Sequence, residues 1–252
     1  MLKIENTEVM GWEAAIRGMR NPKNSWDKSD SKFTEHTLEE WPHDTVKTLD
    51  DIGPNDHKLM MNLADGGPVH AKYRRMITVY LDITAPLYWW KEFDTYKVGT
   101  VANSCSTMHK IHEKEFMMED FSCDHLFGEN DMQKWDERTN VTKDHALAAV
   151  NIDGEWCYFS PLGYIQMTCN MLNRFRQLYL ETKDKNYWWQ MIQLLPSSYN
   201  QRRTVMLNYE VLANIYKSRR NHKLDEWCTL CDWIESLPYS ELITGKEGKA
   251  DV

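Results

Sequence analysis

Bulky apolar residues alternate with polar ones between residues 75 and 83, where the sequence reads Arg-Met-Ile-Thr-Val-Tyr-Leu-Asp-Ile. β-Branched and aromatic residues in this alternation are typical of a strand with one buried face, so we expect a strand here. Ala85-Pro86 closes it. Residues 87–91 follow as Leu-Tyr-Trp-Trp-Lys, and they predict the start of a helix because proline is well tolerated at a first helical position.

A second group of strand-forming residues covers positions 146–151, and a Trp-Cys-Tyr-Phe run follows at 156–159. Asp153-Gly154 lies between the two, and Asp-Gly is a strong signal for a tight turn. The pattern therefore predicts a β-hairpin.

Apolar positions at three- and four-residue intervals predict two long helices further along the chain. The first is expected over residues 163–182. The second is expected to include all the apolar positions from Val205 to Tyr216.

The beginning of the chain is more polar. Residues 20–58 contain several Pro, Asn, Gly and Ser turn signals, which predict a loop-rich surface arm. A helix over residues 57–64 is expected next, capped by Asn55 or Asp56.

We therefore expect a single α/β domain over residues 57–240, with an antiparallel or mixed sheet packed by long helices. A loop-rich arm (1–56) precedes it, and a flexible tail (241–252) follows Leu237-Pro238 and a Gly/Lys-rich end.

Composition narrows the classes of partner. The 252 residues carry a formal net charge of −8, which disfavours binding to polymeric nucleic acid, since phosphate neutralisation requires a basic surface. The sequence has no run of about 18 apolar residues, and its N-terminus lacks the apolar core of a signal peptide. We expect a cytoplasmic protein that does not enter a membrane.

The six cysteines lack the dense spacing of a disulfide scaffold and are expected to be reduced thiols. Cys228-x-x-Cys231 is like half of a zinc site, but residues 225–234 have the pattern of an amphipathic helix, which favours buried structural thiols. His109 and His112 have a spacing that suits a metal, but exposed or hydrogen-bonded histidines are the better interpretation, and we predict no metal site.

The most informative segment runs from His70 to Thr107. A histidine precedes the predicted strand, Ala85-Pro86 begins the predicted helix, and Thr95-Tyr96-Lys97 is followed by seven residues and Cys105. This order resembles the flavin-dependent thymidylate synthases, in which a histidine before a strand is followed by a helix bearing Arg-His-Arg, seven residues and a serine.

A second part of the resemblance lies near the C-terminus. Leu195-Pro196 is followed by eleven residues and then by Asn208, Leu212, Asn214 and Arg219 at the spacing of that family's flavin- and nucleotide-binding helix. An amide suits hydrogen bonds to flavin, and a guanidinium suits a nucleotide.

The resemblance implies roles for individual residues. The cofactor-binding residues would be His70, Lys72, Thr95, Tyr96, Lys97, Asn103, Asn208 and Asn214. The substrate-binding residues would be Glu92, Cys105, Ser106, Thr107 and Arg219, and the catalytic residues would be Lys97, Cys105 and Arg219. For His70, a structural role at the entry to the strand remains an alternative.

Several family positions carry different residues here. The first Arg and the His of the triplet are Thr95 and Tyr96, and Glu92 stands where the family usually has Gln. Three further arginines are replaced by Thr107, Ile192 and Glu210. Loss of a cation from a phosphate-binding site weakens binding by roughly 1 to 3 kcal/mol for each charged hydrogen bond.

The resemblance implies reductive methylation of dUMP to dTMP with methylenetetrahydrofolate, FAD and NADPH, in a homotetramer that holds FAD between its subunits. Cations near the uracil would stabilise negative charge on its carbonyl oxygens. The alternatives are a flavoenzyme that modifies another pyrimidine nucleotide, and a nucleotide-binding or assembly protein that has lost the chemistry.

Cys105 also suggests a nucleophile. Its thiolate would add to pyrimidine C6 if a cation such as Lys97 lowered its pKa. The simpler interpretation is that Cys105 is a small residue in the place of the family's serine.

Overall fold

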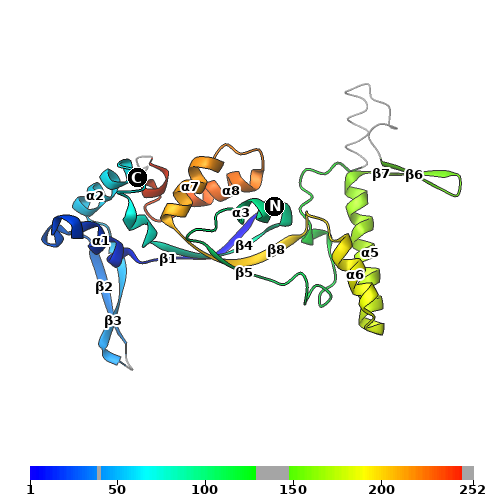
Figure 1. The fold of residues 1–252 in the computed structure, drawn as a ribbon, viewed down its shortest axis with the longest axis horizontal. Helices are drawn as coiled ribbons and strands as arrows, with labels where there is room; N and C mark the ends of the chain where they lie inside the picture. The colour runs from blue at the N-terminus through cyan, green and yellow to red at the C-terminus, as the bar shows by residue number, and fades with distance from the viewer. Residues whose placement is uncertain (39–40, 129–147, 246–252) are drawn as a thin grey trace, which may run out of the picture. The chain divides into compact units, whose positions relative to one another are not determined.

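A computed structural model describes residues 1–38, 41–128 and 148–245 of the chain (Figure 1). The structure is divided into two compact units that interleave in the sequence. The first unit comprises Met1, Thr84–Lys91 and Ser104–Arg202, and the second comprises Leu2–Ile83, Glu92–Asn103 and Arg203–Val252. The predicted α/β class is confirmed.

Among the described residues, the strands form one four-stranded sheet, in the order β1-β4-β8-β5, and two hairpins, β2–β3 and β6–β7. Their bounds are β1 Lys3–Met10, β2 Lys32–Leu38, β3 Trp41–Asp51, β4 Thr78–Pro86, β5 Val101–Ser104, β6 Ala148–Ile152, β7 Glu155–Phe159 and β8 Asn200–Asn208. The helices are α1 Trp12–Arg20, α2 Pro54–Asp65, α3 Leu87–Phe93, α5 Pro161–Thr182, α6 Lys185–Leu194, α7 Tyr209–Arg219, α8 Asp225–Glu235 and α9 Glu241–Thr244. Short 3₁₀ helices are η1 Asn21–Lys23, η2 Trp26–Lys28, η3 Lys72–Arg75 and η4 Met118–Asp120.

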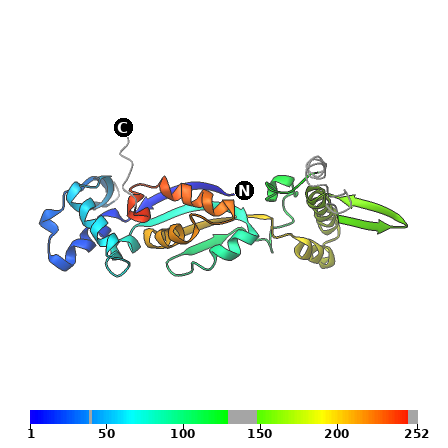
Figure 2. The same ribbon diagram turned by 90° about the horizontal axis from the view of Figure 1, so that it is seen from above.

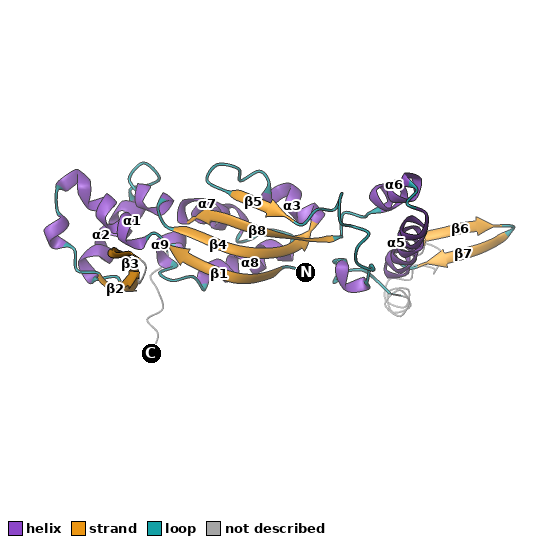
Figure 3. Ribbon diagram, turned by 90° about the horizontal axis from the view of Figure 1, so that it is seen from below, coloured by secondary structure: helices purple, strands orange, loops and turns teal. Residues whose placement is uncertain are grey.

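In the second unit, α7 and α8 lie over one face of the four-stranded sheet (Figures 1 and 2). Seen from below, the strands lie in front of these helices (Figure 3). Val79, Leu81 and Ile83 are fully buried while Tyr80 between them is exposed, so β4 has the one buried face that the alternation predicts. It begins three residues later than expected and continues through Ala85-Pro86.

In the first unit, α5 and α6 contribute side chains to a cluster of buried apolar residues. The cluster consists of Ile111, Phe116, Phe121, Ile165, Cys169, Leu172 and Met191. Ser160 caps α5 by accepting a hydrogen bond from the backbone N–H of Gly163, and Pro161 occupies the first turn. The predicted helix over residues 163–182 is therefore confirmed, as are the helices that start at Leu87 and contain Cys228.

The predicted hairpin is also confirmed, as β6 and β7, which pair antiparallel from Ala148↔Phe159 to Ile152↔Glu155. Its expected first two residues, Ala146 and Leu147, lie outside the described residues.

The prediction of one long helix from Val205 to Tyr216 is wrong. Val205 and Leu207 belong to β8, and the helix begins only at Tyr209. The two buried residues Val205 and Leu207 are spaced two apart, as in a strand, whereas Val211, Leu212 and Ile215 follow helical spacing. The period changes at Asn208, which is the N-cap of α7.

The expected loop-rich arm also needs correction, because β1, α1 and the hairpin β2–β3 lie within residues 1–56. The hairpin pairs antiparallel and extends away from α1 and α2 (Figure 1). Phe33 lies opposite Leu49, but several of the other cross-strand contacts are polar: Lys47 Nζ lies 2.9 Å from Glu35, and His36 lies 3.1 Å from the hydroxyl of Thr48. Polar pairs stabilise a ribbon without producing a hydrophobic pattern, which explains why sequence periodicity missed it.

The N-terminus of α2 is capped from a distance rather than by its own residues. Neither Asn55 nor Asp56 is the cap; the N-cap is Gly53, which makes no side-chain hydrogen bond. The carboxylate of Asp30 accepts hydrogen bonds from the backbone N–H groups of Asn55 and Asp56, at 3.0 and 3.1 Å. A carboxylate at this end also interacts favourably with the helix dipole.

Asp56 is instead the centre of a buried polar cluster. It is completely buried, and its Oδ1 atom lies 2.6 Å from Nε of Arg20, which is 4% exposed. The Oδ2 atom accepts hydrogen bonds from the hydroxyls of Ser29 and Ser31 and from the backbone N–H groups of Asp30 and Ser31. Burial raises the pKa of Asp56, but the hydrogen bonds from Ser31, Ser29 and Arg20 outweigh burial and hold the pKa below its ordinary value.

The variant Asp56→Asn should lower the free energy of unfolding by about 3 kcal/mol, because it leaves the buried guanidinium of Arg20 without its counter-charge. Urea denaturation at pH 7 measures this, with Asp27→Asn, a change at an exposed carboxylate, as the control. Because the pKa of Asp56 is depressed in the folded state, its stabilisation is complete above the ordinary pKa of 3.8 and is lost as the pH falls further. The difference between wild type and variant should therefore shrink below that pH. A difference that is absent at pH 7 would contradict this account.

Candidate functional site

The side chain of Arg219, the last residue of α7, contacts residues from the end of α3, from the segment that follows α3, and from α8. Its Nε atom donates a hydrogen bond to the hydroxyl of Tyr96 at 2.9 Å, and its Nη1 atom lies 2.8 Å from Oε2 of Glu92. The guanidinium stacks over the ring of Trp227 on α8, 4.7 Å from the ring centre. Guanidinium groups commonly combine ion pairing with stacking on aromatic faces.

The same carboxylate oxygen of Glu92 binds other groups. It accepts a hydrogen bond from Nε1 of Trp227 at 2.9 Å and lies 3.7 Å from Nε2 of His222. That imidazole nitrogen is also 2.9 Å from Nη1 of Arg219. These five residues, Glu92, Tyr96, Arg219, His222 and Trp227, form what we call the Arg219 cluster. Within it, each polar side chain has a partner.

A cavity of about 330 Å³ lies beside the Arg219 cluster and shares Tyr96 with it. Its other lining residues are Phe93, Asp94, Lys97, Thr100 and Ala102. The hydroxyl of Thr100 is buried and has no hydrogen-bond partner, whereas Asp94 pairs with Arg203 at 2.7 Å. An aromatic wall with a lysine and an unsatisfied hydroxyl suits a small planar ligand that has polar edges.

Thr95, although it neighbours this cavity in the sequence, does not line it. Its hydroxyl donates a 2.7 Å hydrogen bond to the backbone carbonyl of Glu92. The observed role of Thr95 is thus to satisfy a carbonyl at the end of α3.

Asn208 has a structural role at the start of α7. Its Oδ1 atom accepts a hydrogen bond from the backbone N–H of Val211 at 3.1 Å. Its amide nitrogen lies against Gly99, where an added Cβ would approach to 2.9 Å. Gly99 also has a φ of +81°, a backbone conformation that residues other than glycine rarely adopt.

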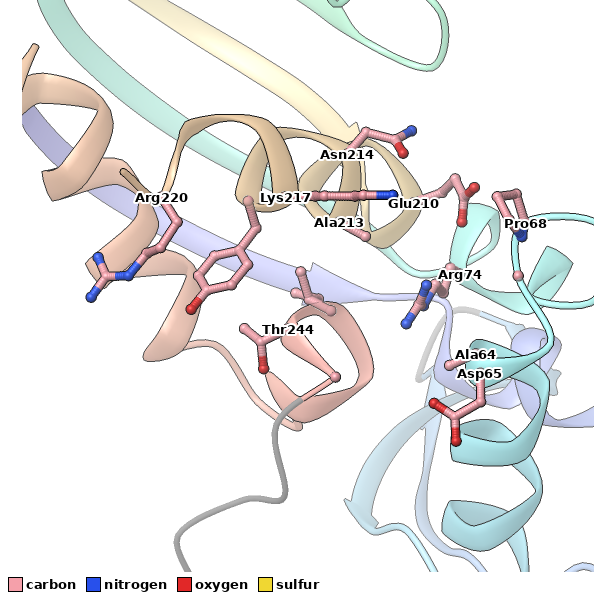
Figure 4. Close-up of a pocket in the computed structure, with 14 residues that line it drawn as sticks. Ala64, Asp65, Pro68, Arg74, Glu210, Ala213, Asn214, Lys217, Arg220 and Thr244 are labelled. Carbon is pink, nitrogen blue, oxygen red and sulfur yellow. The ribbon is translucent and has the colours of Figure 1, made fainter. Parts of the chain in front are cut away.

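Asn214 lines a second cavity, of about 440 Å³. Glu210, Asn214 and Lys217 reach it from one face of α7, while Asp65 and Arg74 line it from α2 and η3 (Figure 4). Oε2 of Glu210 and Nε of Arg74 are both buried and have no hydrogen-bond partner. Glu210, where the flavin-dependent thymidylate synthases have an arginine, is only 9% exposed. Asp65 and Glu210 are acidic whereas Arg74, Lys217 and Arg220 are basic, so this cavity is lined by charges of both signs.

His70 and Lys72 line a third cavity, of about 450 Å³. Its walls are mainly apolar and come from α1, residues 22–25, α2 and residues 69–76. Tyr73 in η3 is buried, which raises its pKa to about 12, and its hydroxyl donates to the backbone carbonyl of Met60. The predicted cofactor-binding residues do not share one cavity: His70 and Lys72 line the third and Asn214 the second, whereas Tyr96 and Lys97 line the cavity beside the Arg219 cluster.

The remaining predicted residues lie in β5 and in the segment that follows it. Asn103 is exposed on β5, in the second unit. Cys105, Ser106 and Thr107 belong to the first unit, where the backbone of Cys105 bonds to the carbonyl of Arg202 and to the side chain of Gln201. The hydroxyl of Ser106 accepts hydrogen bonds from the backbone N–H groups of Met108 and His109. The thiol of Cys105 is exposed.

The four residues Glu92, Tyr96, Lys97 and Arg219 are therefore brought together by the fold, in the second unit. His222 and Trp227 were not predicted. His222 lies only three residues after Arg219, and Trp227 lies within residues 225–234, which were expected to form an amphipathic helix. Neither position shows in the sequence which side chain it will contact, because that depends on how α8 packs.

Neither any protein-family model nor any curated protein sequence matches this chain. Solved structures do match it. The chain has the fold of the flavin-dependent thymidylate synthases. It is similar to thymidylate synthase X (ThyX) from Helicobacter pylori, crystallised with FAD and dUMP, with a TM-score of 0.59, 16% sequence identity, and coverage of 97% of this chain and 98% of the other.

It is also similar to the UMP/dUMP methylase PolB from Streptomyces cacaoi, bound with 5-Br UMP, with a TM-score of 0.53, 10% identity, and coverage of 94% and 88% of the two chains. Coverage of 97% by the first match includes most of residues 1–56, which the motifs in the sequence left unexplained. The likeness in fold thus extends over the N-terminal arm.

The capping role of Asn208 can be separated from its predicted role in flavin binding. Asn208→Ala should lower the free energy of unfolding by about 1 kcal/mol, because the N–H of Val211 loses its acceptor. Asn208→Asp keeps an acceptor oxygen and places a negative charge at a helix N-terminus, so it should retain the stability of wild type while losing the amide donor. Urea denaturation of both variants tests the cap, and FAD titration of Asn208→Asp tests the donor. Equal stability of Asn208→Ala and wild type would contradict the capping role.

Proposed function

We propose that this protein binds FAD and a pyrimidine nucleotide, and that its specific reaction is the reductive methylation of dUMP to dTMP with methylenetetrahydrofolate and NADPH. The fold supports this proposal, because similar chains were crystallised with FAD and dUMP or with 5-Br UMP. One observation carries it further. Two segments singled out by their motifs, 123 residues apart, meet in the hydrogen bond between Arg219 and Tyr96.

The nucleotide is assigned to the cavity beside the Arg219 cluster. Lys97 would provide a positive charge near the carbonyl oxygens of the base, and the unsatisfied hydroxyl of Thr100 would provide a hydrogen bond. The rings of Phe93 and Tyr96 offer surfaces on which a pyrimidine can pack. Arg219 would bind the phosphate, as a guanidinium is suited to do.

FAD is assigned to the cavity around His70. Its apolar walls match an isoalloxazine ring, and Lys23 and Lys72 match an anionic diphosphate. Bound flavin would supply the hydride that reduces the transferred methylene to a methyl group. The part of this chain is to hold and orient it, with His70 and Lys72 as the contacts predicted from the sequence. We extend the proposal to a homotetramer that holds FAD between its subunits.

A second candidate function is nucleotide binding or assembly without turnover. The positions of Thr95, Thr107, Ile192 and Glu210 lack the family's cations, and Arg219 already forms an ion pair with Glu92. Because developing negative charge on the uracil needs nearby cations, these replacements act on the chemical step as well as on binding.

The visible spectrum of the purified protein tests cofactor binding. We expect the absorption bands of bound flavin, either at once or after incubation with FAD and removal of the excess by gel filtration. Because FAD absorbs in the visible range and the chain alone does not, a protein that stays colourless after this treatment would contradict both the cofactor and the reaction.

Growth without thymidine, in a host that lacks thymidylate synthase, tests the reaction. The gene should restore growth, and Lys97→Ala should abolish this rescue because it removes a cation from the nucleotide cavity. Lys91→Ala, at an exposed lysine of α3, is the matched control and should still support growth. A protein that binds FAD but does not rescue growth would favour the second function, and rescue by Lys97→Ala would show that the cavity is assigned wrongly.

A further inference from the structure

Glu92 already occupies the position of an anionic ligand on Arg219. Its Oε2 atom lies 2.8 Å from Nη1 of the guanidinium, which is the distance of a charge-assisted hydrogen bond. Carboxylates and phosphates bind to the same N–H groups of a guanidinium. An incoming phosphate therefore meets a carboxylate that is covalently part of the protein and always present.

The surrounding residues hold this carboxylate in place. Nε1 of Trp227 donates to the same oxygen at 2.9 Å, and His222 lies 3.7 Å from it. On the other side, the hydroxyl of Tyr96 and the ring of Trp227 take up Nε and one face of the Arg219 guanidinium. Arg219 and Glu92 are thus both engaged before any ligand arrives, and together they carry no net charge.

Displacement of Glu92 is nevertheless possible. Its side chain is 37% exposed, so the carboxylate can turn into water without being buried elsewhere. The cost of binding a phosphate is then the loss of the contacts of Glu92 with Arg219 and Trp227. A pyrimidine without a phosphate has no need to displace Glu92 and bears no such cost.

We infer that Glu92 competes with the phosphate of the ligand for Arg219 and thereby determines how strongly the site prefers a pyrimidine nucleotide over the corresponding nucleoside. This inference rests on the proposed function, since it requires a pyrimidine ligand beside the Arg219 cluster. It predicts that the phosphate adds little to the affinity of the wild-type protein. It also makes Glu92 a selectivity residue rather than a catalytic one.

The variant Glu92→Gln isolates this effect. Glutamine has nearly the same size, and its amide oxygen can still accept the hydrogen bond from Trp227, but it carries no charge to compete with phosphate. The control is Glu235→Gln on α8. Glu235 is 35% exposed and also lies beside an arginine, Arg220, at 3.5 Å, so this change removes the same charge at matched exposure in the same unit.

Isothermal titration calorimetry with dUMP and 2′-deoxyuridine measures the phosphate preference as the ratio of the two dissociation constants. For wild type and for Glu235→Gln, the two constants should agree within about threefold. For Glu92→Gln, dUMP should bind about tenfold more tightly or better, while the affinity for deoxyuridine stays unchanged, because the freed arginine gains a charged hydrogen bond to phosphate. Adding Arg219→Gln to Glu92→Gln should remove that gain.

A wild-type protein that binds dUMP about tenfold or more tightly than deoxyuridine would overturn the inference while leaving the proposed function intact. An equal gain in Glu235→Gln would also overturn it, because the effect would then come from net charge alone. Binding of neither ligand by any variant would overturn the inference together with the proposed function. A wild-type ratio of about tenfold or more would overturn the inference even if Glu92→Gln fails to fold.

Discussion

The ion pair between Glu92 and Arg219 is the interaction on which the candidate nucleotide site depends. It joins the last turn of α3 to the last residue of α7, and Trp227 ties both partners to α8 through a hydrogen bond to one and a stacking contact with the other. The side chains are part-buried, at 37% and 20% exposed, so water screens their attraction less than it would on an open surface. The same contacts that fix the geometry of Arg219 also reduce its availability to a ligand. At Arg219, the contacts that stabilise the folded protein therefore compete with the contacts that would bind a ligand.

In the second unit, residues at different positions along α7 have different roles. Asn208 begins the helix as its cap, Glu210 and Asn214 face the cavity shown in Figure 4, and Arg219 ends the helix in the cluster with Glu92. The helix macrodipole favours a cation at this C-terminal end, which suits Arg219. One short helix thus contributes residues to the cavity of Figure 4 and to the Arg219 cluster. A change in its N-terminal cap is expected to disturb both.

Local patterns predicted much of the fold. The helix α5, the helix around Cys228, the buried face of β4 and the hairpin β6–β7 all follow from spacing, capping and turn residues that are close in the sequence. The failures have equally local reasons. Val205 and Leu207 were assigned to a helix because the change from strand to helical spacing at Asn208 was missed, and the hairpin β2–β3 was missed because polar pairs such as Glu35 with Lys47 hold it together. The cap of α2 could not be predicted, since Asp30 reaches it from another segment.

For the candidate site, the order of residues along the chain shows which residue types stand at which spacing: Glu92, Tyr96 and Lys97 in one segment, Asn208, Asn214 and Arg219 in another. It also determined the local elements that carry them, because helices and turns depend on neighbours a few residues apart. The three-dimensional packing was needed to show that Arg219 pairs with Glu92 and that Trp227, 135 residues after Glu92, stacks against Arg219. It was also needed to show that Asn214 and His70 line different cavities. These pairings depend on how whole elements pack around a shared core, and no short-range pattern encodes the partner of a side chain that lies a hundred residues away.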